Sequence, residues 1–355
     1  MNEKILVAMS GGVDSAVAAY LMRASGADCL GVTMKLTCDG VVNAGSCCTE
    51  EDVAEARAVA AALGIPYEAR DFSARFEEAV IRPFVLAYEN GRTPNPCVDC
   101  NRNLKFTALF AYAASQGCDA VATGHYARVE HGADGRYLLR RAADPNKDQS
   151  YMLYALTQEQ LAHARFPLGG MTKDEVRAIA REQGFSNAER KESQDICFVK
   201  GESYAAFIER YTGKVYPPGD FVTEEGETLG QHKGIIRYTV GQRKGLGLAL
   251  PAPLYVCGVD PAKNAVVLGE EQALYARELT ARGINLIAAE RLEQPTRVTA
   301  RVRYRQKDQP ATVTQIDEDR LRIMFDEPQR AITPGQAVVL YDGDVVVGGG
   351  EIAAF

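Results

Sequence analysis

The sequence lacks any long hydrophobic segment. None of its apolar runs approaches the roughly 20 residues that a membrane-spanning helix needs. The first four residues lead directly into a predicted strand, without the charged and apolar regions of a secretory signal peptide. We therefore expect no membrane anchor and no export signal, and a cytoplasmic protein.

The sequence also lacks an excess of positive charge. It has 40 Lys and Arg residues against 47 Asp and Glu residues, a formal net charge of −7. Proteins that bind nucleic acids are often basic overall, so this balance counts against that class. A local basic patch would still be enough to bind phosphates.

The nine cysteines do not favour a disulfide framework, because their number is odd and no export signal is present. Metal binding or thiol chemistry is the better expectation. Cys29, Cys118 and Cys257 lie in strand-like apolar sequence, which predicts core positions.

The first conspicuous motif is the loop Ser10–Ser15, which follows the apolar run Ile5–Met9 and precedes the helix-forming run Ala16–Met22. It has neither the Gly-Lys-Ser/Thr of a P-loop nor a third glycine at dinucleotide-binding spacing. A Gly-rich loop between a strand and a helix favours an anion, and Asp14 could hold a Mg²⁺ that bridges phosphates. The alternative is an ordinary Gly-rich turn.

The first part of the chain alternates strand-like and helical segments, which predicts an α/β fold with a doubly wound parallel sheet. The expected strands are 5–9, 29–34, 66–70 and 120–125, and the expected helices are 16–22, 51–63, 76–88 and 104–115. Ligands bind at the carboxyl ends of such strands. There we expect the Ser10–Ser15 loop, Met34 and Gly124-His125 to meet.

The composition of the sequence changes after about residue 200, where Gly, Pro and Val recur at short intervals. We expect three domains: residues 1–200 with the nucleotide site, a small mainly β central domain at 201–276, and a β-barrel at 277–355.

A second motif, Gly91–Asn101, carries Cys97 and Cys100 behind two prolines. The prolines predict a rigid loop rather than a helix. A following helix N-terminus would lower the thiol pKa and favour the thiolate. The alternatives are half of a structural zinc site, completed by Cys47-Cys48, and a thioredoxin-like redox pair.

Further motifs follow in a defined order. They are Ala122–Arg128, Lys147–Tyr151, Ser193–Phe198, Tyr238–Gly247, Arg303–Gln306 and Pro334–Ala337. Together with Ser10–Ser15, whose Ser-Gly-Gly-x-Asp-Ser pattern is that of the PP-loop ATP pyrophosphatases, they resemble the tRNA-specific 2-thiouridylases along nearly the whole chain. The resemblance implies an adenine nucleotide alpha hydrolase-like first domain.

The resemblance also implies a reaction. ATP adenylates the 2-carbonyl oxygen of the wobble uridine, position 34 of tRNA, and a cysteine persulfide then replaces that oxygen with sulfur. The products are 2-thiouridine, AMP and pyrophosphate. Cys197 matches the persulfide carrier, and Cys100 matches the nucleophile that releases the sulfur, through a Cys100–Cys197 disulfide in one description.

The positions that match the ATP site of the family are Ala8, Met9, Ser10, Gly11, Gly12, Val13, Asp14, Ser15, Met34 and Gly124. Those that match tRNA contacts are Asn95, Pro96, Cys97, His125, Lys147, Asp148, Gln149, Tyr304, Arg305 and Gln336. The implied cofactors are ATP and Mg²⁺. The implied partners are tRNAs that accept Lys, Glu or Gln, and a sulfur donor such as a cysteine desulfurase or a relay protein.

One position departs from part of the family, because Cys97 stands where some members have an aspartate. A thiol does not inherit the acid/base role of a carboxylate. An alternative is that Cys97, Cys100 and Cys197 hold a 4Fe–4S cluster that delivers the sulfur.

Basic residues alternate along 297–307, where Arg297, Arg301, Arg303, Arg305 and Lys307 share one set of alternate positions. If this segment is one strand, these side chains lie on one face and could contact phosphates. A solvated outer face of a barrel strand is the alternative.

Two competing functions remain at this point. One is a PP-loop enzyme that acts on a small molecule, and the other is a non-catalytic RNA-binding module with a relict nucleotide site. The cysteine at Cys197 argues against the first, and the intact loop with Cys100 and Cys197 argues against the second.

Overall fold

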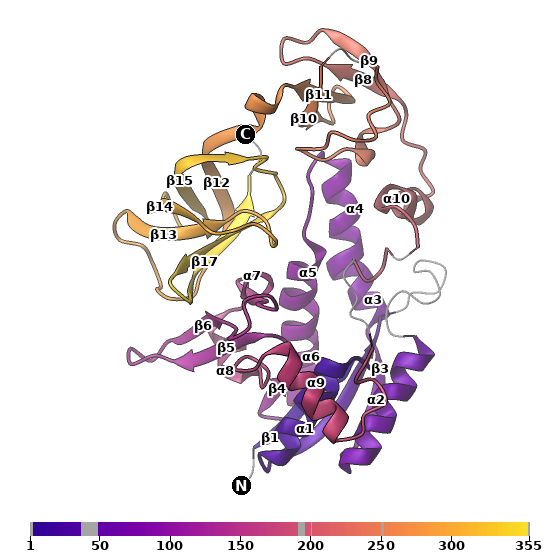
Figure 1. The fold of residues 1–355 in the computed structure, drawn as a ribbon, viewed down its shortest axis with the longest axis vertical. Helices are drawn as coiled ribbons and strands as arrows, with labels where there is room; N and C mark the ends of the chain where they lie inside the picture. Colours follow the sequence, from indigo (N-terminus) through magenta and orange to yellow (C-terminus); the bar gives the residue numbers. More distant parts are fainter. Residues whose placement is uncertain (1–2, 37–48, 191–195, 200, 250–251, 354–355) are drawn as a thin grey trace. The chain divides into compact units, whose positions relative to one another are not determined.

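The computed structural model describes residues 3–36, 49–190, 196–199, 201–249 and 252–353. The chain forms two compact units (Figure 1). Unit 1 comprises Met1–Val80, Cys97–Gly201 and Asp344–Val346, and unit 2 comprises Ile81–Pro96, Glu202–Gly343 and Val347–Phe355. The predictions on Cys47 and Cys48 lie outside the described residues.

Unit 1 is built on a parallel sheet with the strand order β3-β2-β1-β4-β7. The strands are β1 (Lys4–Ala8), β2 (Asp28–Lys35), β3 (Tyr67–Asp71), β4 (Ala120–Ala122) and β7 (Ala164–Arg165). Ile5, Leu6 and Val7 are each 2% exposed or less, although their side chains alternate between the two faces. Both faces of the sheet are therefore covered, which confirms the predicted doubly wound α/β fold.

Helices surround this sheet. They are α1 (Val13–Ala24), α2 (Glu50–Leu63), α3 (Ser73–Phe76), α5 (Pro96–Asp99), the π-helix η2 (Cys100–Ala108), α6 (Leu109–Ser115), α7 (Ser150–Leu153), α8 (Gln158–His163) and α9 (Lys173–Glu182), with the π-helix η1 (Glu77–Ile81) at the edge of the unit. Helix α1 packs against α2 and α9, and α6 packs against β4. A hairpin of β5 (Ala127–His131) and β6 (Tyr137–Arg141) completes unit 1, and Arg140 pairs with Val345.

Local sequence explains most of these boundaries. Helix α2 begins at a capping box in which the Thr49 and Asp52 side chains each bond to the other's backbone N–H. It ends at Gly64, whose left-handed backbone (φ +64°) favours glycine. The expected helix 76–88 is instead divided into α3, η1 and α4 (Arg82–Glu89).

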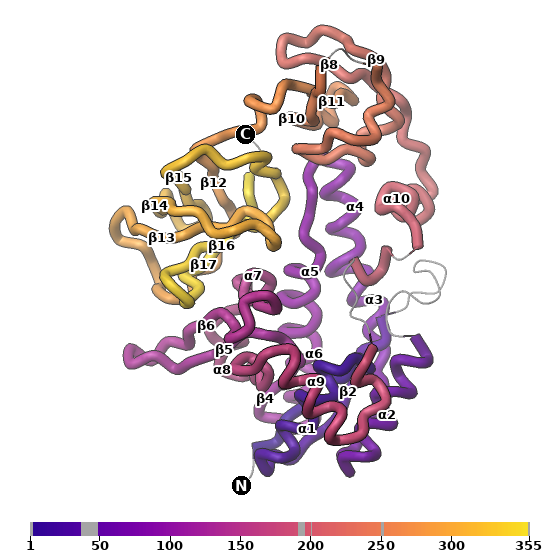
Figure 2. Tube along the Cα trace, in the orientation of Figure 1, coloured from indigo at the N-terminus to yellow at the C-terminus, as the bar shows by residue number. Residues whose placement is uncertain are grey.

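Unit 2 contains α4, α10 (Tyr204–Thr212) and two β structures. Figure 2 shows α4 and α10 side by side, and Phe84 of α4 contacts Phe207 of α10 with ring centroids 6.3 Å apart. The small sheet has the order β10-β11-β8-β9. Its strands are β8 (Gly219–Val222), β9 (Thr228–His232), β10 (Tyr255–Asp260) and β11 (Ala265–Gly269), with the 3₁₀ turns η3 (Ile235–Arg237) and η4 (Glu271–Leu274) nearby in sequence.

The C-terminal strands close into a barrel in the order β12-β15-β14-β13-β16-β17, because β12 also pairs with β17. They are β12 (Tyr275–Leu286), β13 (Thr296–Arg301), β14 (Gln309–Gln315), β15 (Arg320–Arg330), β16 (Ala337–Asp342) and β17 (Val345–Ile352). The predicted barrel is confirmed. The core predictions for the thiols hold only for Cys29, since Cys118 and Cys257 are partly exposed, and Cys118 precedes β4 instead of lying in it.

No helix in the described part of the chain is long and apolar enough to cross a membrane.

The central strand of unit 1 provides a test of the core. Replacing the fully buried Leu6 by alanine should lower the free energy of unfolding by about 3 kcal/mol, through lost burial and a residual cavity. Leu86→Ala is the matched control, because Leu86 is 54% exposed and the same deletion should change stability by less than about 0.5 kcal/mol. Urea unfolding followed by circular dichroism measures both, and equal losses would contradict the assignment.

Candidate active site

The Ser10–Ser15 loop joins the end of β1 to the start of α1, as predicted. Gly11 has φ +77°, a left-handed backbone that favours glycine, and Gly12 is the N-cap of α1. The Ser15 hydroxyl donates to the Gly12 carbonyl (2.9 Å) and accepts from the Ser10 backbone N–H (3.1 Å). These bonds close the loop on itself, so the loop is a preformed cradle of backbone N–H groups at a helix N-terminus.

Gly11 is clamped from two sides. A Cβ atom there would lie 2.5 Å from the Asp52 carbonyl oxygen, so no other residue fits against α2. The Gly11 carbonyl accepts from Asn187 Nδ2 (3.0 Å) and from Arg190 Nη1 (3.3 Å). Arg190 also forms an ion pair with the Asp52 carboxylate, at 2.5 Å. The segment that leads toward Cys197 therefore contacts the loop directly.

Both oxygens of the Asp14 carboxylate accept hydrogen bonds. Lys173 Nζ donates to both of its oxygens, at 2.7 and 2.9 Å, and the Tyr126 hydroxyl donates to one of them at 2.7 Å. Lys173 is the first residue of α9 and is only 8% exposed, while its backbone N–H bonds to Asp144. The Asp14 side chain is still 27% exposed, so a Mg²⁺ ion there would compete with Lys173 for the carboxylate.

The predicted meeting of strand ends is confirmed for the loop and Gly124. A Cβ atom on Gly124 would lie 2.8 Å from the Asp14 carbonyl carbon and 2.9 Å from the Ser15 nitrogen. The two segments follow β1 and β4, which are adjacent strands. From β1 the sheet continues to β2, and from β4 it continues to β7 in the opposite direction. This is the topological switch point at which such sheets bind ligands. Met34 is buried and is the last residue but one of β2, next to the carboxyl end of that strand.

The prediction that Cys97 and Cys100 lie in a loop is wrong. Pro96 is the first residue of α5, and the thiols lie in the first turns of the continuous α5–η2 helix. Proline is well suited to a first helical position, because its missing N–H is not needed there and its φ is already helical. Residues 91–95 of the motif remain outside the helix.

The prediction of a lowered thiol pKa is also wrong for Cys100. Burial raises the pKa of the Cys100 thiol to about 12, and Lys105 offsets part of this effect. Loss of hydration raises the pKa of Cys97 too, although its side chain is more exposed. Desolvation of a thiolate here outweighs the helix N-terminus.

The structure brings the three predicted thiols together. Cys197 is close enough to Cys97 and Cys100 to raise the pKa of both, after burial as the larger cause. Its segment is held by Phe198, which is buried against Phe76 of α3 with ring centroids 5.6 Å apart. No disulfide joins any of the three thiols in this structure.

The thiols do not form a metal site in this arrangement. Among the described residues, no group of three or more His, Cys, Asp or Glu side chains is placed to hold a metal ion. Cys97, Cys100 and Cys197 therefore form no single-ion site in the described structure, and the alternative in which they hold a 4Fe–4S cluster stays a prediction.

His125 is buried at the end of β4 with both ring nitrogens occupied. Its Nδ1 lies 2.7 Å from Thr123 Oγ1, and its Nε2 lies 3.3 Å from Lys105 Nζ. Burial and the Lys105 charge together hold the pKa of His125 well below its usual range, so the ring is neutral. Its predicted contact with tRNA stays a prediction.

The other predicted tRNA residues fall into two groups. In unit 2, Gln336 Nε2 donates to the carbonyls of Thr93 (2.8 Å) and Pro94 (3.1 Å), which places Gln336 beside the segment of Asn95 and Pro96. Tyr304 and Arg305 follow β13 in the barrel.

The second group is Lys147-Asp148-Gln149 in unit 1. Asp148 is buried and accepts bonds from Ala142 and Ser150, and the Gln149 side chain accepts from the Tyr126 N–H. These two side chains therefore support the protein's own backbone.

The predicted basic strand is shorter than expected, since β13 ends at Arg301. Arg297 pairs with Asp326, Arg301 pairs with Asp308, and Arg303 donates to the Ala331 carbonyl and Thr333. Much of the expected phosphate-binding stripe is thus neutralised or used internally. In the part of the chain that the structure describes, Arg305 and Lys307 have no ion-pair partner and are exposed.

Sequence reasoning missed several residues of the site. They are Lys105, Tyr126, Lys173, Asn187 and Arg190. Tyr126 and Lys105 stand inside or beside motifs, but nothing in the sequence shows which side chain they approach. Thr172 marks the start of α9 and so gave an indirect signal for Lys173.

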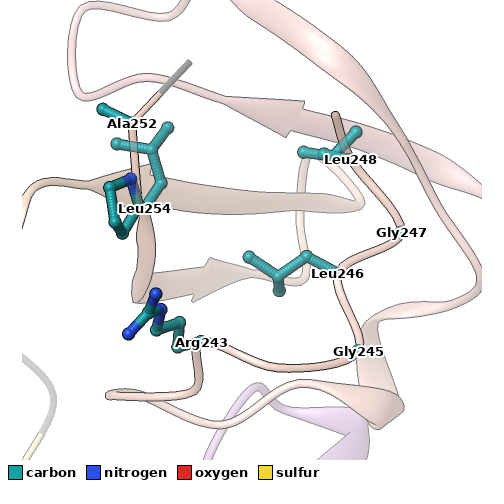
Figure 3. A pocket seen from close by; sticks show the side chains of 8 residues that line it. Arg243, Gly245, Leu246, Gly247, Leu248, Ala252 and Leu254 are labelled. Carbon is teal, nitrogen blue, oxygen red and sulfur yellow. The ribbon is translucent and has the colours of Figure 1, made fainter. Parts of the chain in front are cut away.

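A separate pocket of about 420 Å³ lies in unit 2, and Figure 3 shows Arg243 and three leucines lining it. Its lining residues fall between Arg243 and Leu254, so none of the predicted site residues contributes.

Gly124→Ala should weaken nucleotide binding, because the new methyl group would displace the backbone of Asp14 and Ser15. Gly170→Ala is the matched control in the same unit, since no atom lies within 4 Å of its added Cβ. Isothermal titration calorimetry with ATP measures both variants. Unchanged affinity in Gly124→Ala would contradict the close approach of the two segments.

The thiols should differ in reactivity. With a raised pKa, Cys100 is protonated at neutral pH, and its alkylation should speed up roughly tenfold per pH unit as pH rises toward about 12. The rate of iodoacetamide labelling at Cys100, read by peptide mass spectrometry between pH 7 and 10, measures this slope. A rate that is already maximal at pH 7 would show that the thiolate is stable at this position.

Comparison with known proteins covers almost the entire chain. Residues 3–201 match the family model described as "tRNA methyl transferase HUP domain", residues 205–270 match its PRC-barrel domain, and residues 276–352 match the "aminomethyltransferase beta-barrel domain". A solved 4-thiouridine synthetase in complex with RNA and ATP is 16% identical over 59% of this chain and 50% of that chain, with a TM-score of 0.36, which is too low to support a conclusion.

Curated relatives match at full length. The tRNA-specific 2-thiouridylase MnmA of Clostridioides difficile is 48% identical over 99% of this chain and 98% of its own. That of Clostridium acetobutylicum is 46% identical over 99% of this chain and 100% of its own. With this coverage and the preformed loop at the switch point, the chain belongs to the tRNA-specific 2-thiouridylase family.

Proposed function

We propose that the chain is an ATP-dependent tRNA sulfurtransferase that converts the wobble uridine, position 34, to 2-thiouridine. One observation supports this best: the same compact unit holds a preformed anion cradle at Ser10–Ser15 and a cluster of three thiols that no disulfide joins. Activation by ATP and delivery of sulfur are the two halves of such a reaction. The relatives that match at full length, both named tRNA-specific 2-thiouridylase, support tRNA as the substrate.

In the first half, the loop and the neighbouring Gly124 bind ATP. The positions proposed for this role are those predicted from the sequence, Ala8–Ser15, Met34 and Gly124. Mg²⁺ would arrive with the phosphates, and Asp14 is the acidic side chain of the loop that could contact it. Release of its partner Lys173 would then provide a second cation for the phosphates. Transfer of AMP to the uridine oxygen converts a poor leaving group into a good one.

In the second half, a persulfide on Cys197 attacks the activated carbon and AMP leaves. Cys100 then attacks Cys197 Sγ, so that the outer sulfur stays on the uridine and a Cys100–Cys197 disulfide forms. The proximity of the two thiols supports this order. A persulfide is a soft nucleophile at neutral pH, which suits a site where burial opposes the thiolate. The sulfur donor would be a cysteine desulfurase or a relay protein.

We further propose a division of labour along the chain. Residues 1–200 bind ATP and carry the thiols, residues 201–276 contact tRNA, and residues 277–355 form a barrel that contacts tRNA through Tyr304, Arg305 and Gln336. The exposed Arg305 is suited to phosphate contact. The unpaired anticodon-loop base can be turned out into the site at low cost.

The test is mass spectrometry of nucleosides from tRNA incubated with enzyme, ATP, Mg²⁺ and a sulfide source. We expect 2-thiouridine with wild type, and loss of the product below detection with Cys197→Ser, which cannot carry a persulfide. Cys118→Ser is the matched control, because this thiol lies outside the cluster, and it should keep full activity.

Two outcomes would contradict the proposal. If wild type releases pyrophosphate without tRNA and forms no 2-thiouridine, the enzyme acts on a small molecule instead. If Cys197→Ser thiolates tRNA at the wild-type rate, the persulfide step is wrong.

A further inference from the structure

Lys105 lies next to the thiol cluster without a role in the steps described above. It is half-buried on the π-helix η2, five residues after Cys100. In a π-helix, residues i and i+5 are joined by the backbone hydrogen bond and lie on neighbouring turns of the same face. Helix geometry therefore places Lys105 one turn above Cys100.

His125 holds the Lys105 side chain. Lys105 Nζ lies 3.3 Å from His125 Nε2, and an ammonium group can only donate, so Nε2 must be the acceptor. The ring proton then lies on Nδ1 and is donated to Thr123 Oγ1, at 2.7 Å. The Phe106 and Phe166 rings pack around the imidazole, with centroids 5.9 Å from it, and fix its orientation.

Among the charges that influence the pKa of Cys100, Lys105 is the one that favours the thiolate. Burial is the largest influence on the pKa of Cys100 and raises it, and Cys197, Cys97 and Asp99 act in the same direction. Lys105 lowers the pKa of Cys100, and it does the same for Cys97. Around His125, burial and Lys105 are the influences that lower its pKa.

We propose that Lys105 is a positioning residue for the sulfur chemistry: His125 and Thr123 hold its ammonium beside Cys100, where it stabilises the anionic sulfur that must form there. The inference rests on the proposed function, in which Cys100 attacks a sulfur atom. In this step the Cys100 S–H bond breaks, the electron pair stays on sulfur and the proton passes to water. A fixed cation favours the product of that dissociation.

The experiment measures thiol reactivity without tRNA. Wild type, Lys105→Met, Lys105→Arg and Arg102→Met are labelled with iodoacetamide from pH 7 to 10, and each thiol is read by peptide mass spectrometry. Lys105→Met should slow the labelling of Cys100 at pH 8 roughly tenfold, and Lys105→Arg should restore most of it. Arg102→Met removes the same charge from an exposed site on the same helix and should change the rate less than about twofold.

Cys118 is the internal reference, because Lys105 is not among the groups that influence its pKa. Faster labelling of Cys118 in Lys105→Met would show loss of folding, and Lys105→Gln, which keeps a polar side chain, then replaces it. Unchanged Cys100 labelling in a folded Lys105 variant would overturn the inference.

The thiolation assay is run on the same samples and separates the two proposals. If wild type fails to thiolate tRNA while Lys105→Met still slows Cys100 labelling, the proposed function fails and the role of Lys105 stands. If thiolation proceeds and Cys100 labelling does not depend on Lys105, only the present inference fails.

Discussion

The parallel pairing of β1 with β4 is the constraint on which the candidate site depends. Ile5 to Val7 of β1 align with Ala120 to Ala122 of β4, so the segments that follow the two strands emerge together at one edge of the sheet. They approach so closely that position 124 has no room for a side chain beside Asp14 and Ser15. The buried pairing thus decides where the Ser10–Ser15 loop and the first helix lie relative to Gly124.

Two half-buried or buried lysines then set the charge of the site. Lys173 neutralises Asp14 through both carboxylate oxygens, and Lys105 donates to the neutral ring of His125. Asp14 holds the Lys173 ammonium, and His125 holds the Lys105 ammonium. A bound anion could replace either partner. Because a buried charge is costly without a partner, both contacts keep a cation ready where anions are expected to form.

The sequence predicted the elements whose signals are local. The strand before Ser10, the left-handed glycine after α2 and the closed C-terminal barrel follow from short patterns of apolar, capping and turn residues. The errors arose where a distant contact outweighs a local rule. One example is β13, which ends at Arg301, after which Arg303 bonds to backbone and side-chain groups of the 331–333 segment. Pro96 is a different case, because the local preference of proline for a first helical position was overlooked.

The sequence by itself determined the order of the motifs, the residue types of the site and the family, because these depend only on identity and spacing along the chain. Tertiary structure decided how those residues behave. Burial turned the pKa of Cys100 in the opposite direction from the one that its place at a helix N-terminus favours. Folding also brought Lys173, Asn187 and Arg190 to the Ser10–Ser15 loop across more than half of unit 1's sequence, and no local pattern encodes such a contact.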